Sequence, residues 1–531
     1  MKLLRPKRIN GRVPVLSAAD AINYIPDEAT LCVLGAGGGI LEATTLINAL
    51  AEKYKNTQLP RNLSLISPTG LGDRADRGIS PLAQEGLVKW ALCGHWGQSP
   101  RISDLAEQNK IAAYNYPQGV LTQTLRASAA HQPGILSEIG IGTFVDPRQQ
   151  GGKLNEVTTE ELIKLVEIDN KEYLYYKAIA PNIAFIRATT CDSEGYATFE
   201  DEVMYLDALV IAQAVHNNGG IVMMQVQKMV KKATLHPKAV RIPGYLVDIV
   251  VIDPDQTQLY GGAPVNRFIS GDFILDDSQQ TPLPLNQRKL VARRALYEMR
   301  KGAVGNVGVG IADGIGLVAR EEGCADDFIL TVETGPVGGI TSQGIAFGAN
   351  VNTRAILDMT SQFDFYHGGG LDVCYLSFAE VDRHGNVGVH KFNGKIMGTG
   401  GFIDISATSR KIVFCGTLTA GSLKTEVADG KLTIVQEGRV KKFVNELPEV
   451  TFSGKIALER GLDVRYITER AVFTLKEDGL HLVEIAPGVS LQEDILDKMD
   501  FSPVISPELK VMDKKLFIDA SMGFVLPDAA N

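Results

Sequence analysis

The chain has 531 residues, of which 45% are hydrophobic, and its formal net charge is −9 at pH 7. It is too long for one ordinary domain, so we expect two or three domains with large cores. The negative charge, with no basic block longer than 228–232, argues against a nucleic-acid or membrane surface. No run of about 18 apolar residues occurs, and the basic N-terminus lacks the apolar segment of a signal peptide, so we expect a cytoplasmic protein.

The cysteines and histidines do not form a metal-binding pattern. The six cysteines are scattered without a C-x-x-C pair, which predicts buried thiols rather than a zinc site or disulfides. His384 and His390 are separated by a glycine turn, and this spacing is not specific for a metal. We therefore expect no metal ion.

Taken in chain order, the predicted elements alternate between strands and helices. Apolar runs that end in glycine turns and lead into helical periodicity occur at 30–50, 63–70, 306–323 and 328–339. This βα rhythm predicts an α/β fold built from open, mostly parallel sheets that are covered by helices.

The two halves of the chain resemble each other. Asp192 and Gly195 in the first half match Asp382 and Gly385 in the second half, each following an apolar strand. The polar, proline-containing segment 271–287 is the best linker candidate. We therefore expect two related α/β domains, at residues 1–275 and 288–531, with a site in the cleft between them.

Several glycine loops could present backbone N–H groups to a ligand. Gly35–Gly39 follows a strand, but Ile40 stands where a dinucleotide fingerprint needs its third glycine. In the second loop that position is Asp313, whose charge would face a pyrophosphate, so nicotinamide and flavin cofactors are disfavoured. The loop 398–402 is either a tight turn or a surface of exposed N–H groups, and the segment 93–96 is interpreted as a packed helix end.

The segment 367–370 looks like the HGGG element of lipases. No G-x-S-x-G elbow is present to supply the serine, so the lipase interpretation fails.

Glu333 directly follows the apolar run 328–332 and precedes Gly335. It is either a carboxylate stabilised at the start of a helix or a nucleophile at the carboxyl end of a strand, where open α/β sheets bind their ligands. The local pattern leaves both interpretations open.

Taken together, these segments resemble the family I CoA-transferases, in particular the single-chain short-chain acyl-CoA:acetate, acetoacetate or propionate CoA-transferases. The resemblance covers almost the whole chain, and its long segments are the specific ones. They are 35–39, 86–97, 114–121, 142–156, 308–314, 333–339 and 398–402. A fusion of two homologous domains is what the family implies.

The resemblance also implies roles for individual residues. Glu333 matches the catalytic glutamate, Gly400 matches an oxyanion donor with Gly401 beside it, and Gln118 is expected near the reacting carbonyl. Asp404 and the loop of Gly308, Val309, Gly310, Ile311 and Ala312 are expected to contact CoA. Thr334 stands where many relatives have asparagine, which bears on substrate preference.

The function implied is transfer of CoA between a short-chain acyl-CoA and a free short-chain acid. The expected mechanism is ping-pong through a glutamyl-CoA thioester, since a carboxylate can attack the thioester carbonyl. CoA and acyl-CoA are then substrates, no permanently bound cofactor is expected, and a homo-oligomer (dimer or tetramer) is implied. The alternatives are an acyl-CoA hydrolase and, less favoured, a non-catalytic acyl-CoA sensor.

Overall fold

The computed structural model describes residues 3–276 and 281–528. Contacts within the chain divide it into two units. Unit 1 contains the chain up to Phe273 together with Ile356–Asp364 and His390–Asp404, and unit 2 contains Ile274–Ala355, Phe365–Val389 and the chain from Ile405. The predicted linker 271–287 includes residues 277–280, which lie outside the described residues. The domain limits 1–275 and 288–531 stay a prediction.

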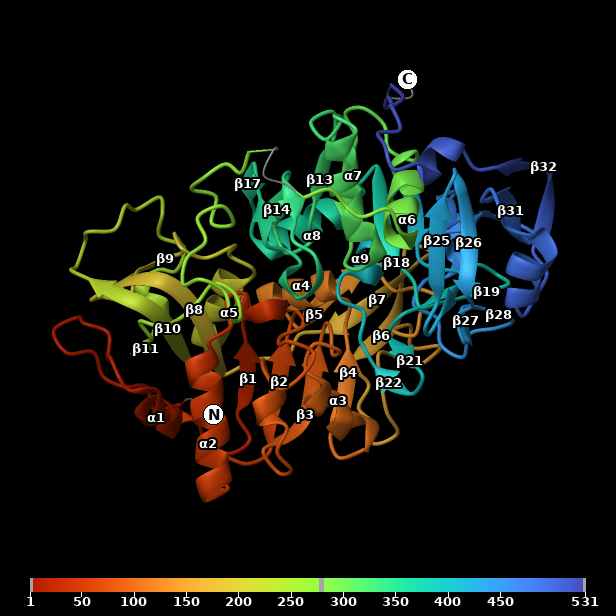
Figure 1. The fold of residues 1–531 in the computed structure, drawn as a ribbon. Helices are drawn as coiled ribbons and strands as arrows, with labels where there is room; N and C mark the ends of the chain where they lie inside the picture. The colour runs from red at the N-terminus through yellow and green to blue at the C-terminus, as the bar shows by residue number, and fades with distance from the viewer. Residues whose placement is uncertain (1–2, 277–280, 529–531) are drawn as a thin grey trace. The chain divides into compact units, whose positions relative to one another are not determined.

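Unit 1 is built on a sheet with the strand order β11-β10-β8-β1-β2-β3-β4, in which every neighbouring pair is parallel. Figure 1 shows β1 to β4 side by side in chain order. The strands are β1 (Thr30–Val33), β2 (Leu63–Ser67), β3 (Val88–Cys93), β4 (Ala112–Asn115), β8 (Ile183–Asp192), β10 (Ile221–Val230) and β11 (Ile249–Ile252). The longer helices are α2 (Thr44–Thr57), α3 (Pro100–Glu107), α4 (Gln118–Ala129) and α5 (Ala208–Asn217). A separate antiparallel sheet contains β5 (Gly134–Ser137), β6 (Ile163–Ile168) and β7 (Lys171–Lys177).

The burial of these elements explains why the sequence forms them. All residues of β2 and β8 are buried, as expected for parallel strands covered on both faces. Helix α2 buries Leu46, Ile47 and Leu50, which lie on one face, and it ends at Gln58 in the left-handed conformation. The helical periodicity after the first glycine loop is therefore confirmed.

Unit 2 is built on a ten-stranded mixed sheet with the order β17-β14-β13-β12-β18-β23-β29-β30-β31-β32. The pairs from β13 to β29 are parallel. β14 pairs antiparallel with β13, and β30 pairs antiparallel with β29 and β31. The strands are β12 (Val304–Val307), β13 (Ile329–Thr331), β14 (Pro336–Val337), β17 (Ala355–Ile356), β18 (Val373–Ser377), β23 (Lys411–Cys415), β29 (Asp463–Ile467), β30 (Ala471–Lys476), β31 (Gly479–Ile485) and β32 (Val504–Val511). The helices in this half of the chain include α6 (Gln287–Leu296), η6 (Ile311–Gly314), α7 (Ile315–Glu321), α8 (Met359–His367), α9 (Phe402–Ser406) and α10 (Gly454–Glu459).

The parallel parts of the two sheets share one strand order. The order β11-β10-β8-β1-β2 of unit 1 corresponds strand by strand to the order β29-β23-β18-β12-β13 of unit 2. The glycine loops after β1 and after β12 are therefore topologically equivalent. This arrangement confirms the predicted fold class of two related open α/β sheets.

The repeat is also seen in the turns that begin at Asp192 and Asp382. The Oδ1 of Asp192 accepts the N–H groups of Glu194 and Tyr196 at 2.8 and 3.1 Å. The Oδ1 of Asp382 accepts the N–H groups two and four residues on, at 2.9 and 3.0 Å. The copies differ because β8 is continuous up to Asp192, whereas the second copy is divided into β18 and β19 (Glu380–Asp382).

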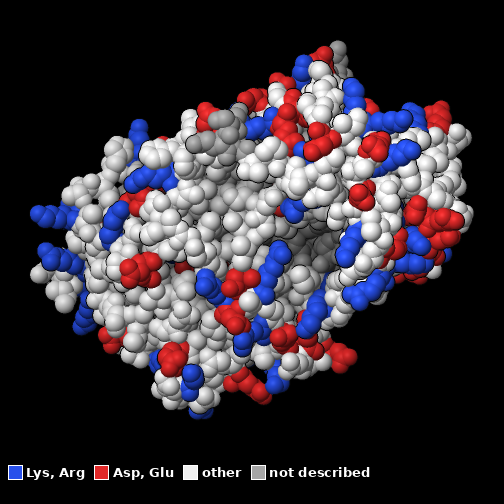
Figure 2. All heavy atoms as spheres, viewed as in Figure 1, with Lys and Arg blue, Asp and Glu red and all other residues white. Residues whose placement is uncertain are grey.

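The distribution of surface charge and the burial of the cysteines agree with what the sequence predicts. Figure 2 shows Lys and Arg interspersed with Asp and Glu on the face in view, rather than gathered in one basic patch. All six cysteines are buried and free, as predicted. Among the described helices, none has the length and apolar character that crossing a membrane requires.

Candidate active site

Glu333 lies in a tight turn at the carboxyl end of β13. The N–H of Gly335 donates to Val332 O at 3.0 Å, and the N–H of Val332 donates to Pro336 O at 3.0 Å. Val332 and Thr334 are buried, whereas Glu333 is only partly buried. The turn therefore buries both neighbours and leaves Glu333 partly accessible, with its Oε2 enclosed. The helix-start interpretation does not apply, because the chain continues into β14 rather than a helix.

Buried polar contacts fix the strand that leads to Glu333. The hydroxyl of Thr331 donates to Gly305 O at 2.9 Å and lies 2.8 Å from the Tyr366 hydroxyl. Asn306 Nδ2 lies 3.2 Å from the same hydroxyl. These bonds join β12, β13 and α8 directly below the turn, so they hold Glu333 at a defined position.

The loop 308–312 leaves the same edge of the unit 2 sheet as Glu333, because β12 and β13 are parallel neighbours. Gly310 has φ of 109°, and a Cβ there would lie 2.5 Å from Ser377 Oγ. The Ser377 hydroxyl donates to Val309 O at 2.8 Å. The glycine is required because the chain passes so close to β18, and the predicted CoA-contacting loop is held by that strand.

The Asp313 side chain is buried within unit 2 and does not face solvent at the loop 308–312. Its carboxylate accepts the Gly310 N–H at 3.3 Å and Gln343 Nε2 at 3.2 Å, and it is ion-paired with Arg288. Burial raises its pKa, and Arg288 opposes that rise. The charge that we expected to face a pyrophosphate is therefore buried and compensated.

In unit 1, two glycine-containing segments lie edge to edge. The N–H groups of Trp96 and Gly97 donate to Met397 O at 2.8 and 2.9 Å, and the Gly400 N–H donates to Gly94 O at 2.8 Å. The segment 93–96 was interpreted as a packed helix end, and this is wrong: Cys93 ends strand β3, and the residues after it pair with the loop 397–400. The pairing partner lies about three hundred residues away in sequence, so the local pattern could not reveal it.

Asn115 joins these two segments from below. Its Nδ2 donates to Gly94 O at 3.0 Å, and its Oδ1 accepts the Thr399 N–H at 3.0 Å. The side chain is completely buried. Asn115 could not be identified from the sequence, because nothing in its local sequence indicates such distant partners.

The Gly400 N–H is engaged by Gly94, so it is not directed at a ligand in this structure. Within the described part of the chain, the N–H of Gly401 has no acceptor. Gly400 itself has φ of 54°, and a Cβ there would lie 3.5 Å from Gln118 Oε1 and 3.7 Å from His95 Cδ2. Gly400 therefore leaves room beside Gln118 and His95, and an oxyanion-donor role for Gly400 or Gly401 stays a prediction.

Gln118 is the first residue of α4, and it is buried beside Gly400. Its N–H donates to Gly400 O at 3.0 Å, and its Nε2 lies 3.2 Å from Met359 Sδ. The structure therefore brings together Gln118 and Gly400, which sequence analysis selected separately.

Asp404 is completely buried, and its Oδ1 accepts the Val120 N–H of α4 at 3.1 Å. The carboxylate therefore fixes the start of the helix that carries Gln118. A direct contact between Asp404 and CoA stays a prediction.

The first glycine loop covers a buried carboxyl group. Glu42 Oε1 accepts the Gly72 N–H at 2.7 Å, and the Tyr260 hydroxyl donates to its other oxygen. Burial raises the pKa of Glu42 to about 7, and Tyr260, Gly72 and Arg187 moderate the rise. Only a short 3-10 turn, Gly37–Gly39, forms before Ile40, so the loop does not open directly into a helix.

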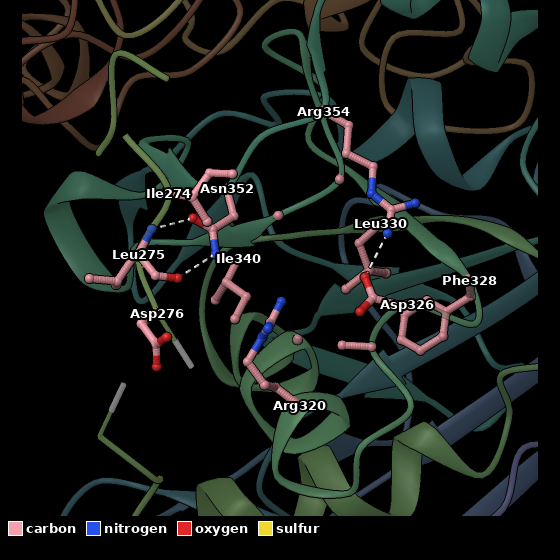
Figure 3. A pocket seen from close by; sticks show the side chains of 14 residues that line it. Ile274, Leu275, Asp276, Arg320, Asp326, Phe328, Leu330, Ile340, Asn352 and Arg354 are labelled. Atoms are coloured by element: carbon pink, nitrogen blue, oxygen red, sulfur yellow. Dashed lines mark hydrogen bonds and ion pairs between the residues drawn. The ribbon is translucent and has the colours of Figure 1, made fainter. Parts of the chain in front are cut away.

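A pocket of about 390 Å³ lies within unit 2, but neither Glu333 nor the loop 308–312 lines it (Figure 3). Figure 3 shows Arg320 on α7 and Arg354, which is ion-paired with Asp326 at 2.6 Å. The lining residues are Ile274, Leu275, Asp276, Gly316, Arg320, Ala325, Asp326, Phe328, Leu330, Gly338, Gly339, Ile340, Asn352 and Arg354. The described residues contain no group of three or more His, Cys, Asp or Glu side chains that could hold a metal ion.

Two α/β units that share the order of five parallel strands, with glycine loops at the carboxyl ends of those strands, define a duplicated α/β fold. A family model described as Coenzyme A transferase matches residues 15–253. The chain is 91% identical, over the full length of both chains, to the acetate CoA-transferase YdiF of Escherichia coli O157:H7. It is 42% identical to the caffeate CoA-transferase of Acetobacterium woodii, over 90% of this chain and 92% of that protein.

A solved structure of the acyl-CoA transferase YdiF from E. coli O157:H7, described as a thioester complex with CoA, superposes with a TM-score of 0.96. It is 89% identical and covers 99% of this chain and 100% of that one. The chain therefore belongs to the coenzyme A transferase family, and it is a CoA-transferase that uses CoA esters as substrates.

Proposed function

We propose that the protein transfers CoA between a short-chain acyl-CoA and a free short-chain carboxylic acid through a thioester on Glu333, with acetate as the first candidate acid. The observation that carries this proposal is the thioester complex described for the 89% identical protein. A thioester between CoA and the protein requires a carboxylate of the protein, and Glu333 is partly exposed in a hydrogen-bonded turn at a strand end.

The proposed reaction conserves the thioester bond, so no ATP is needed. The Glu333 carboxylate attacks the acyl-CoA carbonyl, which forms an acyl-glutamyl anhydride and expels CoA thiolate. The thiolate attacks the glutamyl carbonyl, which releases the first acid and leaves glutamyl-CoA. A second carboxylate then reverses these two steps and leaves with the CoA.

Each attack creates an oxyanion, which a preorganised N–H donor can stabilise by about 3–4 kcal/mol. The Gly401 N–H is our candidate donor, because the Gly400 N–H is already bonded to Gly94. Gln118 can add a neutral donor if its amide leaves Met359, and neutrality matters because a cation would pair with Glu333 and weaken it as a nucleophile. The loop 308–312 is proposed to contact CoA, whose remote groups supply binding energy.

The acid preference rests on the relatives. The 91% identical protein is named for acetate, whereas the 42% identical protein is named for caffeate, so acid selection varies within the family. Acetoacetate and propionate remain further candidates. Incubation with acetyl-CoA and a panel of C2–C4 acids, followed by detection of new acyl-CoA species, identifies the acceptor.

The cofactor requirement, the place of the site, the oligomeric state and the location in the cell are proposals of the same kind. CoA enters and leaves as a substrate, so we propose no permanently bound cofactor. The placement of the site in a cleft between two domains, the homo-oligomer and the cytoplasmic location stay predictions, of which light scattering can test the second.

The decisive experiment traps the intermediate. Acetyl-CoA is added without a second acid, the protein is quenched, and trypsin releases the peptide 321–354, which ends at Arg354 and contains Glu333. Mass spectrometry should find the mass of CoA on Glu333, and borohydride should inactivate only the acyl-CoA-treated enzyme by reducing the thioester. Glu333→Ala should abolish both effects, whereas Glu508→Ala, which alters an exposed residue on β32, should abolish neither.

The same experiment separates the alternatives. Steady release of free CoA without any added acid would indicate an acyl-CoA hydrolase. Turnover with intersecting double-reciprocal plots and no adduct would indicate direct transfer in a ternary complex and would refute the role of Glu333.

A further inference from the structure

His95 is held against the loop that contains Gly400. It lies just after β3, and its backbone forms an antiparallel bridge with Gly398. The N–H of the next residue, Trp96, donates to Met397 O at 2.8 Å. These contacts fix the backbone of His95, so its ring has a defined position beside the candidate donor region.

The edges of the imidazole ring face three glycines. A Cβ on Gly70 would lie 2.8 Å from Nδ1, a Cβ on Gly97 would lie 3.3 Å from Cε1, and a Cβ on Gly400 would lie 3.7 Å from Cδ2. Nε2 is bonded to both Cε1 and Cδ2. Nε2 therefore lies on the side of the ring away from Nδ1. That side faces Gly400 on one flank and Gly97 with the Met397 side chain on the other.

The surroundings favour one neutral form of the ring. Nδ1 is enclosed, and the His95 side chain has no hydrogen-bond partner among the residues that the structure describes. The Cα–H of Gly70 points at Nδ1, a weak contact that suits a lone pair rather than a second proton. Burial, together with the nearby Arg74, lowers the pKa of His95 to about 4, so the ring is neutral at pH 7. The proton then sits on Nε2.

We propose that Nε2–H of His95 donates a hydrogen bond to the oxygen of the acyl or carboxylate group under transfer, as a second donor beside the Gly401 N–H. This inference rests on the proposed function and adds a substrate-contacting residue to it. Gly400 leaves room beside the ring, because a Cβ there would meet only ordinary contacts, at 3.5 Å from Gln118 Oε1 and 3.7 Å from His95 Cδ2.

A neutral imidazole suits this role better than a cation. The reaction depends on the nucleophilicity of a carboxylate, first that of Glu333 and then that of the incoming acid. An imidazolium would pair with either carboxylate and stabilise the ground state, whereas a neutral N–H strengthens its bond chiefly as the oxyanion forms.

The test compares three replacements of His95. His95→Gln places an amide N–H near the position of Nε2, His95→Asn places it near Nδ1, and His95→Phe keeps the ring and removes both nitrogens. We expect His95→Phe and His95→Asn to lower kcat roughly 100-fold, the effect of one lost oxyanion donor, while KM for acetyl-CoA changes less than about threefold. His95→Gln should recover at least a tenth of the wild-type kcat.

The Tm of the His95 variants separates a loss of catalysis from a loss of stability. Because Nδ1 is enclosed without a partner, His95→Phe should leave Tm unchanged or raise it. His236→Phe is the matched control: it makes the same replacement at an exposed position outside the candidate site, and it should leave kcat within about threefold of wild type.

A wild-type kcat in folded His95→Phe would overturn the proposal, as would recovery by Asn but not by Gln. If His95→Phe fails to fold, the kcat of His95→Gln is compared with that of His95→Asn. A higher kcat for Gln supports the proposal, and a higher kcat for Asn overturns it. Adduct formation on Glu333 is measured in parallel in the wild type. Its absence there refutes the proposed function, whereas its presence with unchanged kinetics in His95→Phe refutes only the role of His95.

Discussion

The N–H of Gln118 donates to the carbonyl oxygen of Gly400 at 3.0 Å, and the Gln118 Oε1 lies 3.5 Å from the position of a Cβ on Gly400. The first residue of α4 and the glycine loop are therefore fixed to each other through the backbone. A side-chain substitution at Gln118 preserves this backbone bond, so its effect on catalysis can be separated from an effect on the loop.

Gln118→Ala should lower kcat/KM by about one to two orders of magnitude, the range of one or two lost hydrogen bonds to charged groups. Steady-state kinetics with acetyl-CoA and acetate measures the effect. Gln123→Ala on the same helix is the control, because Gln123 donates to Asp364 at an exposed position. Equal kinetics for the two variants would place Gln118 outside the site.

Glu333→Asp should still fold but lose about 100-fold in kcat. The shorter side chain withdraws the carboxylate by roughly one ångström from a turn that is fixed on both sides, and a displacement of this size can cost that factor. Quenched-flow mass spectrometry should show slow formation of the CoA adduct. An adduct that forms at the wild-type rate would mean that another carboxylate reacts.

Gly400→Ala and Gly398→Ala should have different effects, although both glycines have positive φ. At Gly400 the new methyl meets only ordinary contacts, so the cost in stability is about 1–2 kcal/mol of backbone strain while kcat falls because the methyl stands between Gln118 and His95. At Gly398 the methyl would lie 2.8 Å from the Trp96 backbone nitrogen, so Tm should fall more. Thermal unfolding and kcat are measured for both variants. A larger loss of Tm at Gly400 would contradict this assignment.

Glu42→Gln should change how stability depends on pH. The pKa of Glu42 is about 7 in the folded protein against an ordinary 4.5, so between these values the folded state holds a proton that the unfolded state has released. The wild type therefore loses stability as the pH rises from about 4.5 to 7, by up to about 3 kcal/mol from this group. The Gln variant lacks this loss, so its Tm relative to wild type should increase across that window. A constant difference in Tm between pH 4.5 and 8 would show that Glu42 is ionised in the folded protein.

Features defined by local pattern could be predicted from the sequence. The alternation of apolar runs, glycine turns and helical periodicity indicated the α/β sheets, and the same pattern placed Glu333 at a strand end. The repeat around Asp192 and Asp382 was visible because the aspartate bonds N–H groups only two and four residues on, so the motif is complete within a short segment.

Features that depend on distant pairing could not be predicted. The engagement of the Gly400 N–H by Gly94, the support from Asn115 and the position of the His95 ring all join segments far apart in the chain. The inward turn of Asp313 was missed for a related reason: its partner Arg288 lies on another helix, and a sequence pattern does not show which way a charged side chain points.

The shared strand order makes two turns, one in each unit, equivalent. Strand β2 occupies in unit 1 the place of β13 in unit 2, and Thr69 follows β2 at the same distance at which Glu333 follows β13. Thr69 is buried, and its hydroxyl donates to Gly35 O, so this copy of the turn holds its own glycine loop and presents no carboxylate. Of these two equivalent turns, the one in unit 2 therefore carries a carboxylate and the one in unit 1 carries a hydroxyl engaged within the protein. Each polypeptide should accordingly carry a single covalently bound CoA at saturation, half of what two active copies would hold.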